Sequence, residues 1–115
     1  MATGTLSVIA TPIGNLSDLS PRAATVLAEV AVLYCEDTRH TARLLDHIGV
    51  RPPCRALHAH NENERMIEVL ERLAEGAHLG LVSDAGTPCL SDPGARVIDA
   101  VHAAGHIVHT IPGPF

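Results

Sequence analysis

Short apolar runs alternate along the chain with longer stretches that have the periodicity or the end signals of helices. The apolar runs have the length of buried strands and cover residues 6–10, 31–35, 55–58, 79–83 and 107–111. The predicted helices between them cover residues 21–29, 38–45, 62–75 and 93–104. Such alternation with short connections predicts parallel strands joined by right-handed crossovers. We therefore expect an α/β fold, a five-stranded, mostly parallel, doubly wound sheet with helices on both faces.

Residues with special backbone roles mark the predicted helix ends. Ser20 followed by Pro21 is an N-cap with proline at the first helical position. Thr38 is placed to cap the second helix. Gly49 and Gly76 stand where a residue in the left-handed conformation ends a helix.

The stretch 62–75 shows the clearest amphipathic pattern. Its predicted buried face consists of Met66, Ile67, Leu70, Leu73 and Ala74. Its predicted exposed face consists of Glu64, Arg65, Glu68, Glu71, Arg72 and Glu75. On that exposed face, Glu68 and Arg72 form an i, i+4 pair of favourable orientation.

Length and composition fit one compact domain over residues 1–115. Of the 115 residues, 46% are hydrophobic and 18% are charged, which argues against disorder. No apolar run approaches the roughly 20 residues of a membrane span, and the N-terminus lacks the basic and apolar regions of a secretory signal. We expect a cytoplasmic protein with no membrane partner.

Charge and residue usage exclude several chemistries. All eight side chains counted as Lys or Arg are arginines, so a Walker A phosphate loop, a Schiff-base catalyst and a lysine general base are excluded. Three widely spaced cysteines indicate reduced thiols. A net charge of −5 does not favour nucleic-acid binding by this chain alone, and 2% aromatic residues provide no platform for base stacking.

Candidate chemistry lies in the loops after the strands, because open parallel sheets bind ligands beyond the carboxyl ends of their strands. This rule selects the loops 11–18, 36–41, 60–63 and 84–92. They hold most of the Gly, Pro, Asn and Asp residues outside the helix caps. Structural turns need the same residue types, so this composition alone does not decide between a turn and a site.

The 84–92 loop carries the strongest signal. Its run of small residues, 85–87, lets backbone groups approach a ligand closely, as adenosine recognition requires. Asp84 could accept hydrogen bonds from a ribose or an amino group. Ser91 or Asp92 could merely cap the next helix. We expect both roles, with Asp92 as the cap and residues 84–88 binding the ligand.

The 36–40 segment brings two carboxylates, a guanidinium and an imidazole into five residues. A helix start would explain the acids, because they complement the helix dipole. Arg39 and His40 are unfavourable at that positive end, which favours a charged site that faces a substrate. The 60–62 segment, His-Asn-Glu, gives a similar but weaker signal, because Asn61 or Asn63 could simply cap the next helix.

Metal and nucleotide signatures are weak or missing. Among the histidines and cysteines only His58 and His60 are tightly spaced, and there is no His-Glu-x-x-His, so we expect no metal. No two glycines have Gly-x-Gly spacing, so the dinucleotide fingerprint is absent. A Gly-x-Ser-x-Gly elbow for acyl transfer is absent as well.

Several sequence motifs nevertheless resemble one family over the whole chain. They are the residues 10–16, 18–23, 36–41, 60–62, 83–88, 91–94 and 111–114. In this order they resemble the N-terminal region of the ribosomal small subunit methyltransferase I family. At Phe115 the chain departs from that family, which usually has a small residue there.

The resemblance implies a tetrapyrrole (class III) methylase that binds S-adenosylmethionine between two α/β domains. This chain would be the N-terminal half, and the second, C-terminal domain would be absent from it. The family methylates the ribose 2′-oxygen of a cytidine in the decoding region of 16S ribosomal RNA. A homodimer acting on the small ribosomal subunit is implied as well. The implied cofactor-binding residues are Pro12, Gly14, Asp84, Ala85, Gly86, Thr87, Pro88, Pro112 and Gly113.

A ribose hydroxyl is a poor nucleophile, so methyl transfer needs alignment and an acceptor for the proton. From their clustering at one strand end, Asp37 and His40 are candidate proton acceptors, and Arg39 is suited to bind a phosphate or orient a carboxylate. Positioning alone, with water taking the proton, is the alternative. The candidate substrate-binding residues are Asn15, Glu36, Arg43, His60, Asn61 and Glu62.

Two other functions stay open. One is a C-methyltransferase of tetrapyrrole precursors, with the same fold and cofactor. The other is a non-catalytic binding or dimerisation domain, since half of the cleft would come from elsewhere. Under the RNA hypothesis, a local basic edge would consist of Arg39, Arg43, Arg51 and Arg55.

Overall fold

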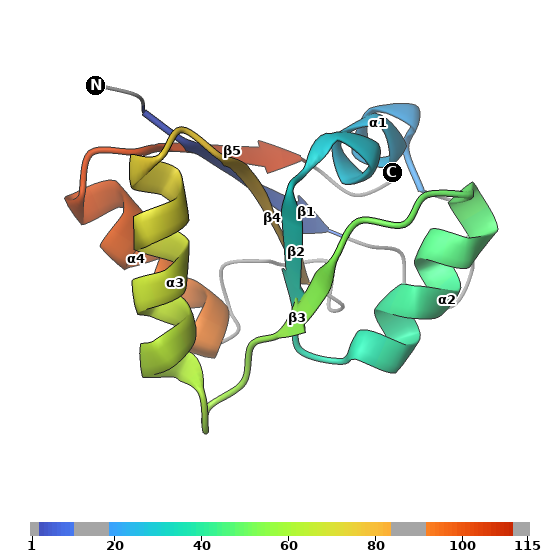
Figure 1. The fold of residues 1–115 in the computed structure, drawn as a ribbon. Coiled ribbons are helices and arrows are strands. Elements are labelled where there is room, and N and C mark those ends of the chain that lie inside the picture. Colours follow the sequence, from blue (N-terminus) through green and yellow to red (C-terminus); the bar gives the residue numbers. More distant parts are fainter. Residues whose placement is uncertain (1–2, 11–18, 84–91, 112–115) are drawn as a thin grey trace.

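The computed structural model describes residues 3–10, 19–83 and 92–111, and these form a parallel sheet covered by helices (Figure 1). The strands are β1 (Thr5–Ala10), β2 (Val32–Cys35), β3 (Cys54–Ala56), β4 (His78–Ser83) and β5 (Ile107–Ile111). The helices are α1 (Pro21–Glu29), α2 (Thr38–Ile48), α3 (Glu62–Ala74) and α4 (Asp92–Ala103). The sheet order is β3-β2-β4-β1-β5, and each strand pair is parallel. The predicted α/β fold is confirmed.

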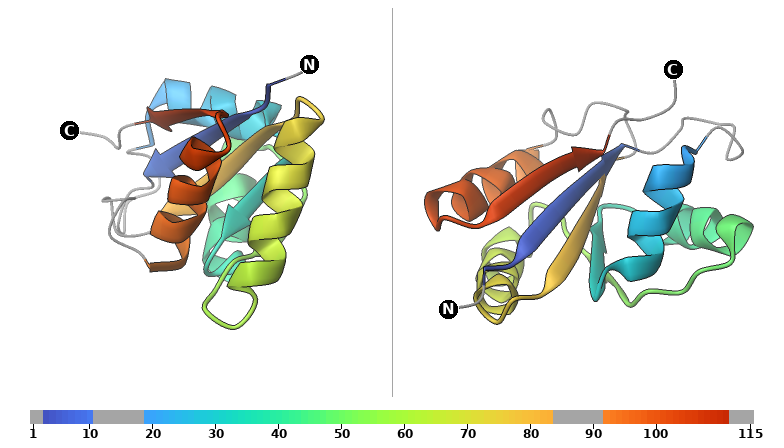
Figure 2. Two further views of the ribbon diagram at one scale, coloured as in Figure 1. Left: turned by 90° about the vertical axis from the view of Figure 1, so that its left-hand side faces the viewer. Right: turned by 90° about the horizontal axis from the view of Figure 1, so that it is seen from above.

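The order of the strands decides which face each helix covers. From β1 through β2 to β3 the chain moves toward one edge of the sheet, and from β3 through β4 to β5 it moves back toward the other edge. Right-handed crossovers therefore put α1 and α2 on one face and α3 and α4 on the other, as Figure 2 shows. Two buried apolar clusters follow, one under each pair of helices.

Most predicted helix ends are confirmed. The Ser20 hydroxyl oxygen accepts a hydrogen bond from the Ala23 N–H at 3.1 Å, and Pro21 begins α1. Gly49 ends α2 with a φ of 76°, a conformation that disfavours residues with a Cβ. The predicted cap of α2 is wrong: Asp37, not Thr38, is the N-cap residue, and the helix continues to Ile48.

The buried face of α3 is rotated around the helix axis relative to the predicted one. Ile67 is 58% exposed and Ala74 is exposed, whereas Val69 is buried. Glu68, expected in solvent, has a side chain only 21% exposed. The reason lies in the sheet, because two polar side chains on its α3 face, Tyr34 and Arg55, bind the Glu68 carboxylate.

The third strand ends two residues earlier than predicted. After Ala56 only one further ladder bond forms, from the Leu57 N–H to the Cys35 carbonyl at 2.8 Å. The chain then turns, with the Asn61 N–H bonded to the His58 carbonyl at 3.2 Å.

None of the helices in the described part of the chain is long and apolar enough to cross a membrane.

Candidate functional site

Every strand of the sheet delivers its following segment to the same edge. Ala10 at the end of β1 is in register with Ser83 at the end of β4, Cys35 with Ala56, and Ile9 with Ile111. The neighbours β1 and β4 lead to helices on opposite faces, so the strand order reverses between them. In open α/β sheets such a switch point is where ligands bind.

The predicted cofactor residues follow directly from this switch point. They fall in the segments 11–18, 84–91 and 112–115, which lie outside the described residues, as does the predicted substrate residue Asn15. What the structure describes is the starting point of each segment, at Ala10, Ser83 and Ile111. The helix after the 84–91 segment begins at Asp92, one residue before the predicted start.

Asp37 comes two residues after β2 and caps α2. Its Oδ1 accepts hydrogen bonds from the N–H groups of His40, at 3.2 Å, and Arg39, at 3.0 Å. These bonds, the one from His40 first, hold the pKa of the Asp37 carboxyl below its usual value. The carboxylate is exposed and ionised, so the helix-start interpretation of this segment is confirmed for Asp37. Glu36 and Arg39 are also exposed at this edge.

The loop after β3 is built around Asn61. Its Oδ1 accepts a hydrogen bond from the His58 N–H at 2.9 Å, and its Nδ2 donates to the Ala56 carbonyl at 3.0 Å. Asn61 is the N-cap residue of α3, as predicted, but its side chain makes no hydrogen bond to the start of the helix. The amide is used for the shape of the loop, which leaves His60 exposed.

Glu62, predicted to bind substrate, is turned inward. It is 8% exposed, and its Oε1 accepts a hydrogen bond from Nη1 of Arg96 on α4 at 2.9 Å. An acidic residue in the first turn of α3 also suits the positive end of the helix dipole. Glu62 thus links the first turn of α3 to α4.

The hypothetical basic edge is divided by the sheet. Arg39 and Arg43 are exposed on α2, whereas the Nε of Arg55 lies 3.1 Å from Oε2 of Glu68 on the opposite face. Arg51 pairs with Asp46, with 2.6 Å between Nη1 and Oδ1. The prediction that the four arginines form a single basic edge is therefore wrong. Arg55 lies on β3, and alternate residues of a strand point to opposite faces of the sheet. Arg39 and Arg43 are left as the exposed pair on α2.

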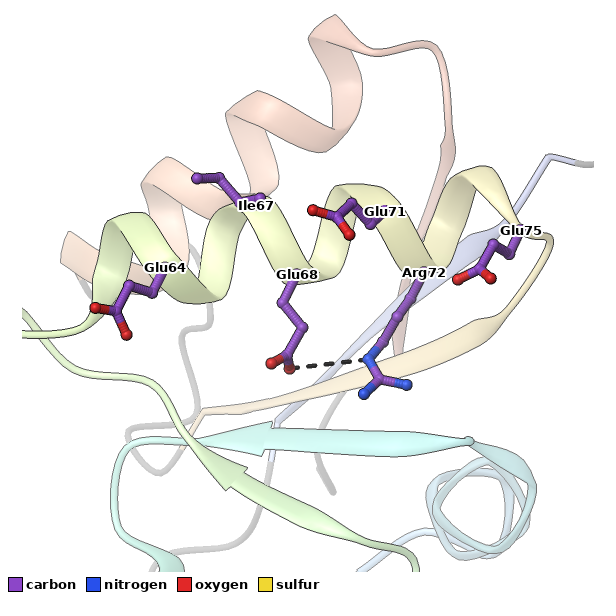
Figure 3. Close-up of a pocket in the computed structure, with 6 residues that line it drawn as sticks. All are labelled: Glu64, Ile67, Glu68, Glu71, Arg72 and Glu75. Carbon is purple, nitrogen blue, oxygen red and sulfur yellow. Dashed lines mark ion pairs between the residues drawn. The ribbon is translucent and has the colours of Figure 1, made fainter.

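A polar cluster under α3 was not predicted from the sequence. The buried Tyr34 hydroxyl donates a hydrogen bond to Oε2 of Glu68, and Arg55, Arg65 and Arg72 have guanidinium nitrogens 3.1, 3.6 and 3.9 Å from Glu68 oxygens. A hollow of about 440 Å³ runs along this side of α3 (Figure 3). One signal could have indicated the cluster: a tyrosine inside a buried strand needs a partner for its hydroxyl.

The buried hydroxyl gives a prediction for alkaline pH. Burial, reinforced by the Glu68 hydrogen bond, raises the pKa of Tyr34 far above its ordinary value of about 10. The neutral phenol is favoured in the folded state, so its contribution to stability is present below about pH 10 and is lost as pH rises. We expect the phenolate absorbance to appear together with loss of helical circular dichroism. Because the chain has one tyrosine and no tryptophan, the absorbance reports Tyr34 alone. Ionisation of Tyr34 at about pH 10 in a folded protein would contradict this.

The described residues contain no group of three or more His, Cys, Asp or Glu side chains that could hold a metal ion. What they do contain is a charged edge next to a topological switch point. In open α/β domains, the place where ligands bind is the crevice at the carboxyl ends of the strands.

The chain belongs to the family of tetrapyrrole (corrin/porphyrin) methylases, whose match covers residues 5–114. It is 54% identical over 111 residues to a protein of Xylella fastidiosa (strain Temecula1) named ribosomal RNA small subunit methyltransferase I, covering 96% of this chain and 41% of that protein. A protein of the same name from Pseudomonas aeruginosa is 50% identical over 113 residues, covering 98% and 40%. The chain thus spans about two fifths of the length of these curated relatives.

Two solved structures share the fold. Uroporphyrin-III-C-methyltransferase from Thermus thermophilus superposes with a TM-score of 0.73 at 16% identity, covering 96% of this chain and 48% of that one. Diphthine synthase superposes with a TM-score of 0.74 at 16% identity, covering 96% and 45%. At these identities the likeness shows the fold alone.

Proposed function

We propose that this chain supplies the N-terminal half of the cleft of an S-adenosylmethionine-dependent ribosomal RNA methyltransferase, with a second domain supplying the other half. The observation that carries the proposal is the 54% identity, over 96% of this chain, to a ribosomal RNA small subunit methyltransferase I. The common exit of all predicted site segments at one edge supports it, since a cleft there can be closed by a further domain.

The described residues at the switch point fit the proposed cofactor. Ala10, which ends β1 in register with the last residue of β4, carries a small side chain, so a ligand can lie close to the backbone there. S-adenosylmethionine supplies an electrophilic methyl group when bound. The chain's part would be to hold it through the residues that follow β1, β4 and β5.

The finer proposal is methylation of a cytidine ribose 2′-oxygen in the decoding region of 16S ribosomal RNA, by a cytoplasmic homodimer. In this proposal His40 accepts the hydroxyl proton. Asp37 orients the start of α2, because a carboxyl whose pKa is lowered is a weak proton acceptor at neutral pH. The exposed Arg39 and Arg43 on the same helix would bind RNA phosphates.

A substrate comparison tests this function. The complete protein should transfer labelled methyl groups from S-adenosylmethionine to 30S subunits and not to uroporphyrinogen. The match to the family of tetrapyrrole (corrin/porphyrin) methylases makes a tetrapyrrole substrate the second candidate. Transfer of labelled methyl groups to uroporphyrinogen, without transfer to 30S subunits, would overturn the RNA proposal.

Calorimetry on the 115-residue chain tests whether it supplies only half of the cofactor-binding cleft. We expect weak or no binding of S-adenosylmethionine, because the second domain would supply the remaining contacts, and no methyl transfer. The complete protein measured under the same conditions is the control. Submicromolar affinity of the 115-residue chain would show that its own residues complete the cofactor site.

A further inference from the structure

Three consecutive polar residues after β3 differ in how they are used. His60 is exposed, Asn61 is partly buried and Glu62 is 8% exposed. From the sequence, all three are candidates for substrate contact. Their burial separates one side chain that faces solvent from two that face the protein.

Asn61 holds the turn that carries His60. Its side chain binds two residues that precede His60, through the Ala56 carbonyl at 3.0 Å and the His58 N–H at 2.9 Å. Its own N–H donates to the His58 carbonyl at 3.2 Å. The Ala56 carbonyl also accepts a hydrogen bond from Nε of Arg65 at 2.9 Å. These four hydrogen bonds, together with the bond from the Leu57 N–H to the Cys35 carbonyl, fix the backbone from Ala56 to Asn61.

A ring contact connects this fixed backbone to His60. The imidazole rings of His58 and His60 meet edge to face, with their centroids 5.8 Å apart. Asn61 sets the position of His58, and His58 in turn restricts the ring of His60. Pre-ordering a side chain in this way reduces the entropy that it loses on binding a ligand.

Glu62 anchors the other end of the loop. Its buried carboxylate is paired with Arg96 on α4, with 2.9 Å between Oε1 and Nη1. The pair joins the first turn of α3 to the neighbouring helix, so the segment that follows His60 is fixed as well. A substrate would have to break this pair to reach Glu62.

We propose that His60 is the residue of this loop that contacts the RNA, and that Asn61 and Glu62 are positioning residues that act through it. The inference rests on the proposed function and makes it more specific. It assigns one hydrogen-bonding contact with RNA to the His60 imidazole, and none to Asn61 or Glu62.

A double-mutant cycle on the complete protein tests the assignment, with the dissociation constant for 30S subunits as the readout. We expect His60→Ala to weaken binding about tenfold, the loss of one hydrogen bond of about 1.4 kcal/mol. Asn61→Ala should weaken it by a similar factor, and the double variant should lose no more than either single variant. Asn63→Ala, an exposed asparagine two residues further on, is the matched control and should bind as the wild type does.

Hydrogen exchange of the His58 amide provides a readout that does not depend on RNA. Asn61→Ala should accelerate this exchange at least tenfold, and His60→Ala and Asn63→Ala should not. Unchanged exchange in Asn61→Ala, normal 30S binding by His60→Ala, or additive losses in the cycle would each overturn the inference. Failure of the wild-type protein to bind 30S subunits would instead overturn the proposed function, and the RNA contact with it.

Discussion

Gly4→Ala lowers the free energy of unfolding by about 3 kcal/mol, the upper range for overpacking of a closely packed site. Gly4 is buried just before β1, where an added Cβ would lie 2.6 Å from the Leu73 Cα, 2.6 Å from the Leu73 carbonyl oxygen and 2.7 Å from that of Ala77. All three atoms belong to the backbone, in the last turn of α3 and in the connection from α3 to β4, so no side-chain rotation relieves the overlap. The measurement is urea unfolding followed by circular dichroism.

Gly49→Ala is the matched control for this effect. Gly49 has a φ of 76°, but no atom lies within 4 Å of an added Cβ. The substitution therefore lowers the free energy of unfolding by about 1 kcal/mol, the cost of placing an alanine in the left-handed conformation. Equal losses in the two variants would show that space around Gly4 does not limit the packing of α3 on β1.

Features of the fold that depend on neighbouring residues can be predicted from the sequence, whereas features that depend on contacts between distant residues cannot. The helix start at Ser20-Pro21 and the helix end at Gly49 depend on neighbouring residues, and both are confirmed. The parallel pairing of the strands follows from the alternation of strands and helices with short connections. Gly4, by contrast, has no local pattern around it. The residues that exclude a side chain there, Leu73 and Ala77, are far away in the sequence.

The rotation of α3 shows the limit of periodicity. An apolar stripe indicates that a helix packs on something, but it does not say which edge of the stripe faces the core. Here the polar edge is partly covered, because Glu68 meets Tyr34 from a strand 34 residues earlier. A pairing over that distance is set by topology, and a pattern within the helix cannot reveal it.

For the site, position was more predictable than role. The rule that ligands bind at strand ends put all the candidate segments at one edge, and the register of the strands agrees with it. Roles depend on hydrogen bonds that only the folded chain makes. Asn61 is the clearest example, since its amide is bound to its own loop.

His40→Gln should lower kcat for methyl transfer by the complete protein about 10²-fold, the smaller end of what a general base contributes. Glutamine keeps the size and polarity of the side chain but takes up no proton at neutral pH. His47→Gln, the same change at the other end of α2, is the control and should leave kcat unchanged.

Asp37→Asn separates capping from catalysis at the same helix end. Asparagine caps helices as well as aspartate does, so the two bonds to the N–H groups of Arg39 and His40 can be kept while the charge is lost. We expect kcat to fall by less than about tenfold, because a carboxyl with a lowered pKa contributes little as a base. A loss as large as that of His40→Gln would make Asp37 the proton acceptor. Full activity in both variants would mean that positioning carries the reaction and that water takes the proton.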